Sequence, residues 1–154
     1  MQFTAREDVA LPIEQVFAAI SDFDAFERAA MRRGAQVQRT GAAPDLGRGW
    51  SIRFDYRGRE RHLRSEIIRH APPTGLASSG RVGGLTGTLT ADLVALSPRR
   101  TRLALVLDVT GTTMGARILL QSVRLTRGSL ERKLAARVER FARDLEARHL
   151  RPTL

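Results

Sequence analysis

The stretch that decides the fold is the C-terminal run GARILLQSVRLTRGSLERKLAARVERFARDLEARHL, from Gly115 to Leu150. Its apolar residues recur at steps of three, four or, once, seven positions, a spacing that places side chains on one face of a helix. They are Leu119, Val123, Leu130, Leu134, Val138, Phe141 and Leu145. We therefore predict one long amphipathic helix, roughly 50 Å from end to end. Such a helix needs a broad partner surface for its apolar face.

The preceding chain can supply that surface as a sheet. Residues 2–10 alternate between apolar and polar side chains, which is the period of a half-buried strand. Pro12 ends this run, and the apolar spacing beyond it predicts two short helices, over 13–20 and from Asp22 to just before Gly34. Short turns then separate further runs that we interpret as strands of an antiparallel meander, in an α+β fold. These runs are 35–40, 50–56, 59–70, 76–82, 85–96 and 101–110.

Length and composition indicate a single domain over residues 1–150, followed by a short tail over 151–154. The polar alternation that begins at Met1 does not resemble a signal peptide, and no apolar run is long enough to cross a membrane. We therefore expect a cytoplasmic protein. The absence of cysteine excludes disulfides, thiolate metal sites and a cysteine nucleophile.

The formal charge of +10 comes almost wholly from arginine, since Lys133 is the only lysine. A basic chain raises the hypothesis of a nucleic-acid or anionic-membrane partner. The arginines are scattered over every segment, however, and acids in the last helix are spaced to pair with them. The expected pairs are Arg127–Glu131, Glu139–Arg143, Arg140–Asp144 and Asp144–Arg148. We expect a solvated surface and no specific nucleic acid, and leave transient contact with an anionic membrane open.

Several motifs along the chain fit one known superfamily. The segment VALPIEQVFAAISD from Val9 to Asp22 joins a strand, a proline, a helix and an aspartate, and Trp50, Gly58, Pro72-Pro73 and Phe141-Ala142 follow. This arrangement resembles the START-like, or SRPBCC, helix-grip superfamily. Its members include Bet v 1-like plant proteins, polyketide cyclases and aromatases, and coenzyme-Q-binding proteins. The resemblance implies a curved seven-stranded antiparallel sheet around the last helix, with a cavity for an apolar small molecule or lipid between them.

Strand phase, together with the apolar stripe of the last helix, predicts which residues would line such a cavity. The apolar candidates are Phe3, Ala5, Val9, Trp50, Ile52, Phe54, Leu63, Ile67, Leu76, Leu89, Leu93, Leu103, Leu105, Leu107, Val123, Leu130 and Leu134, and the polar ones are Glu7, Tyr56, Ser65, Ser78 and Arg127. An apolar pocket with few polar groups is typical of small-molecule sites. Two questions stay open: these positions could instead fill a solid core, and Glu7 could either pair with Arg127 or lie in water at a sheet edge.

Candidates for acid–base chemistry are few. His62 and His70 lie on the strand phase opposite Leu63 and Ile67, so we expect them outside, and His149 lies near the end of the last helix. The carboxylates Asp55, Glu66, Asp92 and Asp108 also lie on polar phases of their strands. No metal-ligand spacing occurs, so we predict neither a metal nor a cofactor. No catalytic residue is assigned.

The leading hypothesis is a protein that binds a lipid, quinone or polyketide-like compound between the sheet and the last helix. One alternative is a polyketide cyclase or aromatase, which would need an acid or base such as His62, Glu7 or Tyr56 inside the cavity. Another alternative is a peripheral module that docks on anionic lipid or nucleic acid through its arginines. The sequence leaves catalysis and oligomeric state open.

Overall fold

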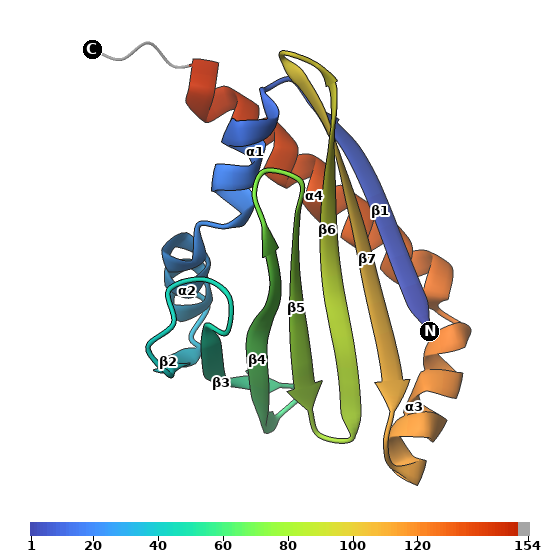
Figure 1. Cartoon of the computed structure of the whole chain (residues 1–154). Helices are drawn as coiled ribbons and strands as arrows, with labels where there is room; N and C mark the ends of the chain where they lie inside the picture. Colours follow the sequence, from blue (N-terminus) through green and yellow to red (C-terminus); the bar gives the residue numbers. More distant parts are fainter. Residues whose placement is uncertain (151–154) are drawn as a thin grey trace.

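The computed structural model describes residues 1–150, so the predicted tail lies outside the described residues. Its centre is one seven-stranded antiparallel sheet in the order β1-β7-β6-β5-β4-β3-β2, as Figure 1 shows. The predicted meander and the helix-grip class are confirmed. The strands are β1 (Gln2–Val9), β2 (Gln36–Thr40), β3 (Gly49–Tyr56), β4 (Arg59–Ala71), β5 (Gly75–Val82), β6 (Leu85–Ser97) and β7 (Arg100–Gly111).

Two short helices, α1 (Ile13–Ile20) and α2 (Phe23–Arg32), follow β1 as the sequence predicts. The carbonyl oxygen of Pro12 accepts the first bonds of α1, and the Asp22 side chain caps α2 by accepting from the Ala25 N–H at 3.2 Å. β1 pairs with β7, so the first strand joins the last across the sheet. The buried Thr101 hydroxyl donates to the Leu11 carbonyl oxygen at 2.8 Å and fixes this junction.

The predicted single C-terminal helix is wrong, because the segment forms two helices. α3 (Met114–Arg124) lies at the end of β7, and α4 (Arg127–Leu150) follows after a tight turn. The turn closes through bonds from the Leu125 N–H to the Ser122 carbonyl and from the Thr126 N–H to the Val123 carbonyl. The chain must change direction here to leave β7 and run along β1, and the apolar spacing gives only a weak sign of this, the gap between Val123 and Leu130.

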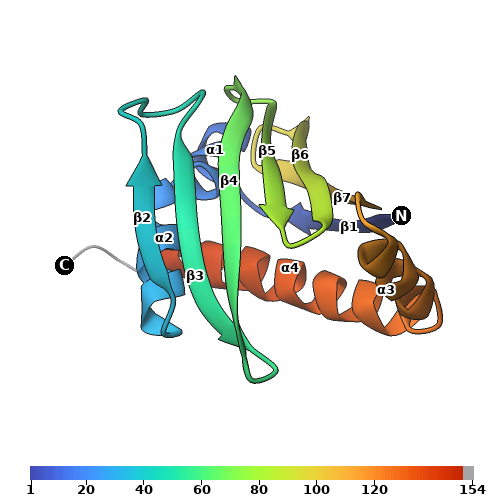
Figure 2. The ribbon, with the colours of Figure 1, turned by 90° about the horizontal axis from the view of Figure 1, so that it is seen from below.

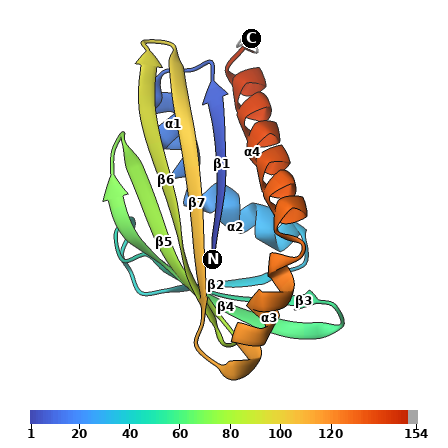
Figure 3. The ribbon, with the colours of Figure 1, turned by 90° about the vertical axis from the view of Figure 1, so that its right-hand side faces the viewer.

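α4 runs beside β1 in the same direction, as Figures 1 and 3 show. The Arg127 guanidinium donates to the Gln2 carbonyl at 2.8 Å, and the Ala10 N–H donates to the Glu146 carboxylate at 2.7 Å. The lengths agree, since a strand rises about 27 Å from Gln2 to Ala10 and a helix about 29 Å from Arg127 to Glu146. This match fixes the position of α4 along the sheet.

Arg143 supplies a third contact between α4 and β1. Its guanidinium lies 2.7 Å from the Glu7 carboxylate and 2.8 Å from that of Glu146. The expected pair Arg143–Glu139 is therefore wrong, and of the two alternatives left open for Glu7, the pair with Arg127 is wrong too. The position of α4 along β1 decides these partners. The spacing of charged residues within the helix carries no information about that position.

Two of the ion pairs expected within the last helix are present, Arg127–Glu131 at 3.5 Å and Arg140–Asp144 at 4.0 Å. The pair Asp144–Arg148 is wrong, because Arg140 is the only partner of Asp144 within residues 1–150. Both observed pairs span one helical turn on an exposed face. They therefore contribute little to the position of α4 on the sheet.

The tightest packing lies where α1 and the C-terminal half of α4 meet the sheet. Val9, Val16, Leu103, Ala142 and Leu145 are almost completely buried there. Figure 2 shows α4 passing beneath the sheet with the strands curving above it. Across residues 1–150, no helix is both long and apolar enough to span a bilayer. Location in the cytoplasm stays a prediction from the sequence.

Candidate functional site

A cavity of about 580 Å³ lies between the inner face of the sheet, α2 and the C-terminal half of α4. The solid-core alternative is therefore wrong. α4 packs mainly against β1, which leaves the inner face of the more distant strands uncovered. The wall consists of Ile20, Phe23, Phe26, Glu27, Ala30, Val37, Trp50, Ile52, Leu63, Ser65, Ile67, Leu76, Ser78, Leu89, Ala91, Leu103, Leu105, Leu134, Arg137, Val138 and Phe141.

Many of the residues selected by strand phase lie in this wall. Alternation along each strand places them on the concave face, and the antiparallel register keeps neighbours such as Trp50 and Ser65 together. Their part in ligand binding stays a prediction. Those in the wall are Trp50, Ile52, Leu63, Ser65, Ile67, Leu76, Ser78, Leu89, Leu103, Leu105 and Leu134.

Other predicted lining residues lie outside the cavity. Phe54 and Tyr56 share the phase of Ile52 but continue toward the β3–β4 turn, where Tyr56 is exposed. Val123 belongs to α3, and Leu130 and Arg127 lie in the first turn of α4, where Arg127 contacts the start of β1. Six further residues predicted to line the cavity are not part of its wall. Leu93 and Leu107 lie on the inner face of the sheet, and Phe3, Ala5, Glu7 and Val9 lie on β1. Alternation along a strand predicts on which face of the sheet each side chain lies. It does not predict how far the cavity extends along that strand.

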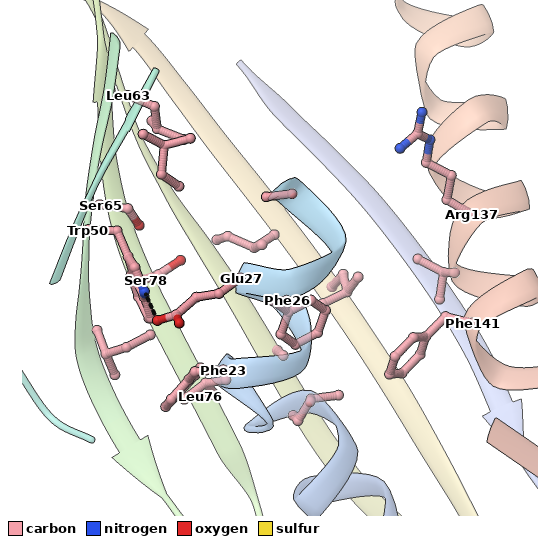
Figure 4. A pocket seen from close by; sticks show the side chains of 18 of the residues that line it. Phe23, Phe26, Glu27, Trp50, Leu63, Ser65, Leu76, Ser78, Arg137 and Phe141 are labelled. Carbon is pink, nitrogen blue, oxygen red and sulfur yellow. Dashed lines mark hydrogen bonds between the residues drawn. The ribbon is translucent and has the colours of Figure 1, made fainter. Parts of the chain in front are cut away.

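Three aromatic side chains in the wall were not among the predicted lining residues. Phe23 and Phe26 come from α2, and Phe141 comes from α4 (Figure 4). The Phe26 and Phe141 rings stack with centroids 6.4 Å apart, so the two helices meet over the cavity. Phe23 meets the Trp50 ring edge-on at 5.5 Å. The signal was present in the sequence, because Phe23, Phe26 and Ala30 recur at helical spacing on one face of α2.

A closed polar network surrounds Glu27, the carboxylate in the cavity wall. Oε1 accepts from Trp50 Nε1 at 2.7 Å and from Arg48 Nη2 at 2.8 Å, and Arg39 Nε donates to the same atom at 2.8 Å. Asp24 also accepts from both arginines. The hydrogen bond from Arg39, followed by those from Trp50 and Arg48, outweighs burial and lowers the pKa of Glu27 to about 2. Glu27 therefore stays ionised and fully hydrogen-bonded near neutral pH.

Arg137 is the cation in the cavity wall, and the sequence analysis did not select it. It projects from α4 toward the sheet side in Figure 4. Within residues 1–150 its guanidinium makes no hydrogen bond or ion pair. Ser65 is less available, because its hydroxyl donates to the Ser79 carbonyl at 2.9 Å. Arg137 is therefore the side chain best able to meet a polar group of a ligand.

The candidate acids and bases are elsewhere. His62 faces Ser51 on the neighbouring strand and is no wall residue. His70 was expected outside, which is wrong: a β-bulge after Ile67 reverses the strand phase. Its ring packs against Phe17 at 5.5 Å on the inner side, under α1 and outside the cavity. Within the described chain, no group of three or more histidine, aspartate or glutamate side chains could hold a metal.

The sequence matches the family model described as polyketide cyclase/dehydrase and lipid transport over residues 1–149. No curated protein matches significantly. Among solved structures, the ZhuI aromatase/cyclase from Streptomyces sp. R1128 has a TM-score of 0.66 at 16% identity, over 96% of this chain and 94% of that one. Ara h 8.0201 has a TM-score of 0.59 at 12% identity, over 90% and 97%.

A third structure, an HSP90 activator from Plasmodium falciparum, has a TM-score of 0.51 at 19% identity, over 70% of this chain and 72% of that one. At these identities, all three likenesses show the fold alone.

Proposed function

Because this chain belongs to the polyketide cyclase/dehydrase and lipid-transport family of the START-like superfamily, we propose that it binds an apolar small molecule in the cavity beneath its sheet. The observation that supports this proposal is the cavity itself, which has a volume of about 580 Å³ and a wall made almost entirely of apolar side chains. Pockets for small molecules typically span about 300–1,000 Å³. Lipids, quinones and polyketide-like compounds all have the required apolar surface.

The energetics favour a ligand that is mostly apolar. Burial of roughly 300 Å² of apolar ligand surface would contribute about 7 kcal/mol before the entropic cost of association. A polar end of the ligand would be placed at Arg137, since its guanidinium lies at an exposed position of α4 and also borders the cavity. A carboxylate or another hydrogen-bond acceptor suits this cation.

The same wall disfavours acid–base catalysis as the main function. Glu27 cannot donate a proton near neutral pH because its pKa is about 2. The three groups that a cyclase-type enzyme could have used, His62, Glu7 and Tyr56, lie outside the wall. Binding therefore requires fewer further assumptions than a cyclase or aromatase activity.

The first test is native mass spectrometry of the freshly purified protein, with extraction and identification of any bound compound. Titration with the fluorescent fatty acid cis-parinaric acid would then compare the wild type with Leu105→Arg and Leu89→Trp. Both changes alter the wall, one by adding a charge and the other by filling the cavity. Leu96→Arg is the control, because Leu96 is exposed and lies outside the wall.

We expect both wall variants to lose at least about tenfold in affinity for the probe, which corresponds to about 1.4 kcal/mol. Arg137→Gln should weaken binding of cis-parinaric acid and leave binding of its uncharged methyl ester unchanged. If Leu105→Arg does not fold, binding of the probe to Leu89→Trp alone decides the test. Stoichiometric binding that survives in a folded Leu89→Trp protein would place the ligand elsewhere.

A further inference from the structure

The outward face of α3, continued by its C-cap residue Leu125, carries an unusual set of exposed apolar side chains. Met114, Ile118 and Leu125 are 73%, 56% and 90% exposed. Their spacing of four and seven residues places them in one stripe along the helix. Leu119, half exposed, lies beside it. Scattered exposed leucines are common, but a contiguous apolar stripe on a helix marks a contact surface.

The opposite face of α3 holds this stripe firmly outward. Thr113 caps the helix by accepting from the Ala116 N–H at 3.1 Å, and Ala116 is buried. Gly111 at the end of β7 lies so close to α3 that a Cβ there would be 2.8 Å from the Arg117 backbone nitrogen. The helix cannot roll to bury its stripe without breaking this close backbone contact.

The charge around the stripe has one sign. No acidic residue occurs between Asp108 and Glu131. Arg117 and Arg124 lie seven residues apart on one flank of the stripe, and neither has an acidic partner within residues 1–150. Arg39, Arg48, Arg69, Arg102 and Arg143 pair with carboxylates, whereas the charges of Arg117 and Arg124 stay available to an anionic partner.

We propose that α3 docks on the surface of an anionic lipid bilayer, with its stripe in the interface and its arginines on the headgroups. An apolar stripe flanked by basic residues is the pattern of helices that lie in a membrane surface. Figures 1 and 3 show α3 at one end of the molecule, beyond the sheet, where it can meet a flat surface.

Other occupants fit less well. A nucleic acid would neutralise Arg117 and Arg124 but leave Met114, Ile118 and Leu125 in water. A second copy of the chain would bring like charges together, since no acid lies in this segment to meet them. This inference concerns the outer surface and goes beyond the proposed ligand binding, so each can fail without the other.

The test is co-sedimentation of the full chain with vesicles of phosphatidylcholine alone and of phosphatidylcholine mixed with phosphatidylglycerol, at low and physiological salt. One variant combines Ile118→Gln with Leu125→Gln, and another combines Arg117→Gln with Arg124→Gln. The matched controls are Val94→Gln and Arg99→Gln, which change an exposed valine, 57% accessible, and an exposed arginine away from α3.

We expect binding only to vesicles that contain phosphatidylglycerol, with a loss of about 10- to 30-fold in either α3 variant and none in the controls. Melting temperatures should stay unchanged, because the altered side chains are exposed. If one α3 variant unfolds, Met114→Gln provides an independent change in the same stripe.

Several outcomes would overturn the proposal. They are no binding to anionic vesicles, binding that the apolar variant does not reduce, and retention of a nucleic acid without retention by vesicles. A dimer in sedimentation velocity that only the apolar variant dissociates would instead identify a second copy as the occupant.

Discussion

The two helices that flank the cavity are held to the sheet by different interactions. α4, beside β1, buries Val138, Ala142 and Leu145, and its ion pair to Glu7 is partly exposed. α2, beside β2, buries only Phe23 and is tied to the sheet by the carboxylate of Glu27. The cavity thus lies between a wall held by apolar packing and a wall held by ion pairs.

This difference indicates how each wall responds to perturbation. Exposed ion pairs contribute only about 0.2–1 kcal/mol, so the α4 wall depends on its buried leucine and alanine contacts. Removal of one partner from a largely buried pair costs about 3–5 kcal/mol, because the other charge loses its compensation. The α2 wall should therefore be sensitive to charge and pH, and the α4 wall to side-chain volume.

The largest effect is expected for Leu145→Ala in the α4 wall. Leu145 is 2% exposed, and its truncation should lower the free energy of unfolding by about 3–5 kcal/mol through lost burial and a new cavity. Leu150→Ala, at 81% exposure on the same helix, should change it by less than about 0.5 kcal/mol. Urea unfolding measures both. Equal small losses would mean that packing does not hold α4.

Glu27→Gln should have the next largest effect. The change removes one of the two counter-charges of Arg48, whose side chain is 13% exposed. Because Asp24 still accepts from Arg48 at 2.9 Å, the cost should be about 2–3 kcal/mol in unfolding free energy, below that of a pair with no other partner. Glu7→Gln is the matched control at the contact between β1 and α4 and should cost less than about 1 kcal/mol, because Arg143 is half exposed. A larger loss from Glu7→Gln would reverse the comparison of the two walls.

Acidification should weaken the α2 wall first. The pKa of Glu27 is lowered from 4.5 to about 2, so below pH 4.5 the unfolded chain binds a proton that the folded chain does not. The stability that Glu27 contributes is present above pH 4.5 and falls toward pH 2, by up to about 1.4 kcal/mol per pH unit.

Thermal unfolding across this pH range should show a shallower slope in Glu27→Gln than in the wild type. The remaining slope would come from Asp8 and Asp24. Hydrogen bonds from Arg102 and from Arg48, respectively, lower the pKa of these two carboxyls. An unchanged slope would show that the network does not couple protonation to folding.

The smallest effect is expected for Gly128→Ala in the first turn of α4. A Cβ there would meet nothing closer than the Arg132 guanidinium at 3.4 Å, so alanine should raise the unfolding free energy by about 0.5–1 kcal/mol. Gly58→Ala is the contrasting variant. Gly58 has φ +75° in the β3–β4 turn, so alanine at this position should lower the unfolding free energy. Differential scanning calorimetry would detect both signs, and a loss in Gly128→Ala would contradict the expectation.

Prediction from the sequence was most accurate where structure depends on local periodicity. Alternation placed Trp50, Ile52 and Leu63 on the inner face, and the pairing with β4 confirms it. It was wrong for His70, because a bulge after Ile67 inserts one residue and reverses the phase. The helix break was also visible only as a weak signal, since the apolar series skips a turn between Val123 and Leu130.

The sequence by itself determined the strands, the two short helices and most of the inner faces, because each depends on side chains a few residues apart. Only the tertiary structure decided how far α4 extends along β1, which brought Arg137 and not Arg127 to the cavity. It likewise assembled Glu27 of α2, Arg39 of β2, Arg48 of the β2–β3 loop and Trp50 of β3. Contacts of this kind depend on the docking of whole elements, whose relative positions no local spacing encodes.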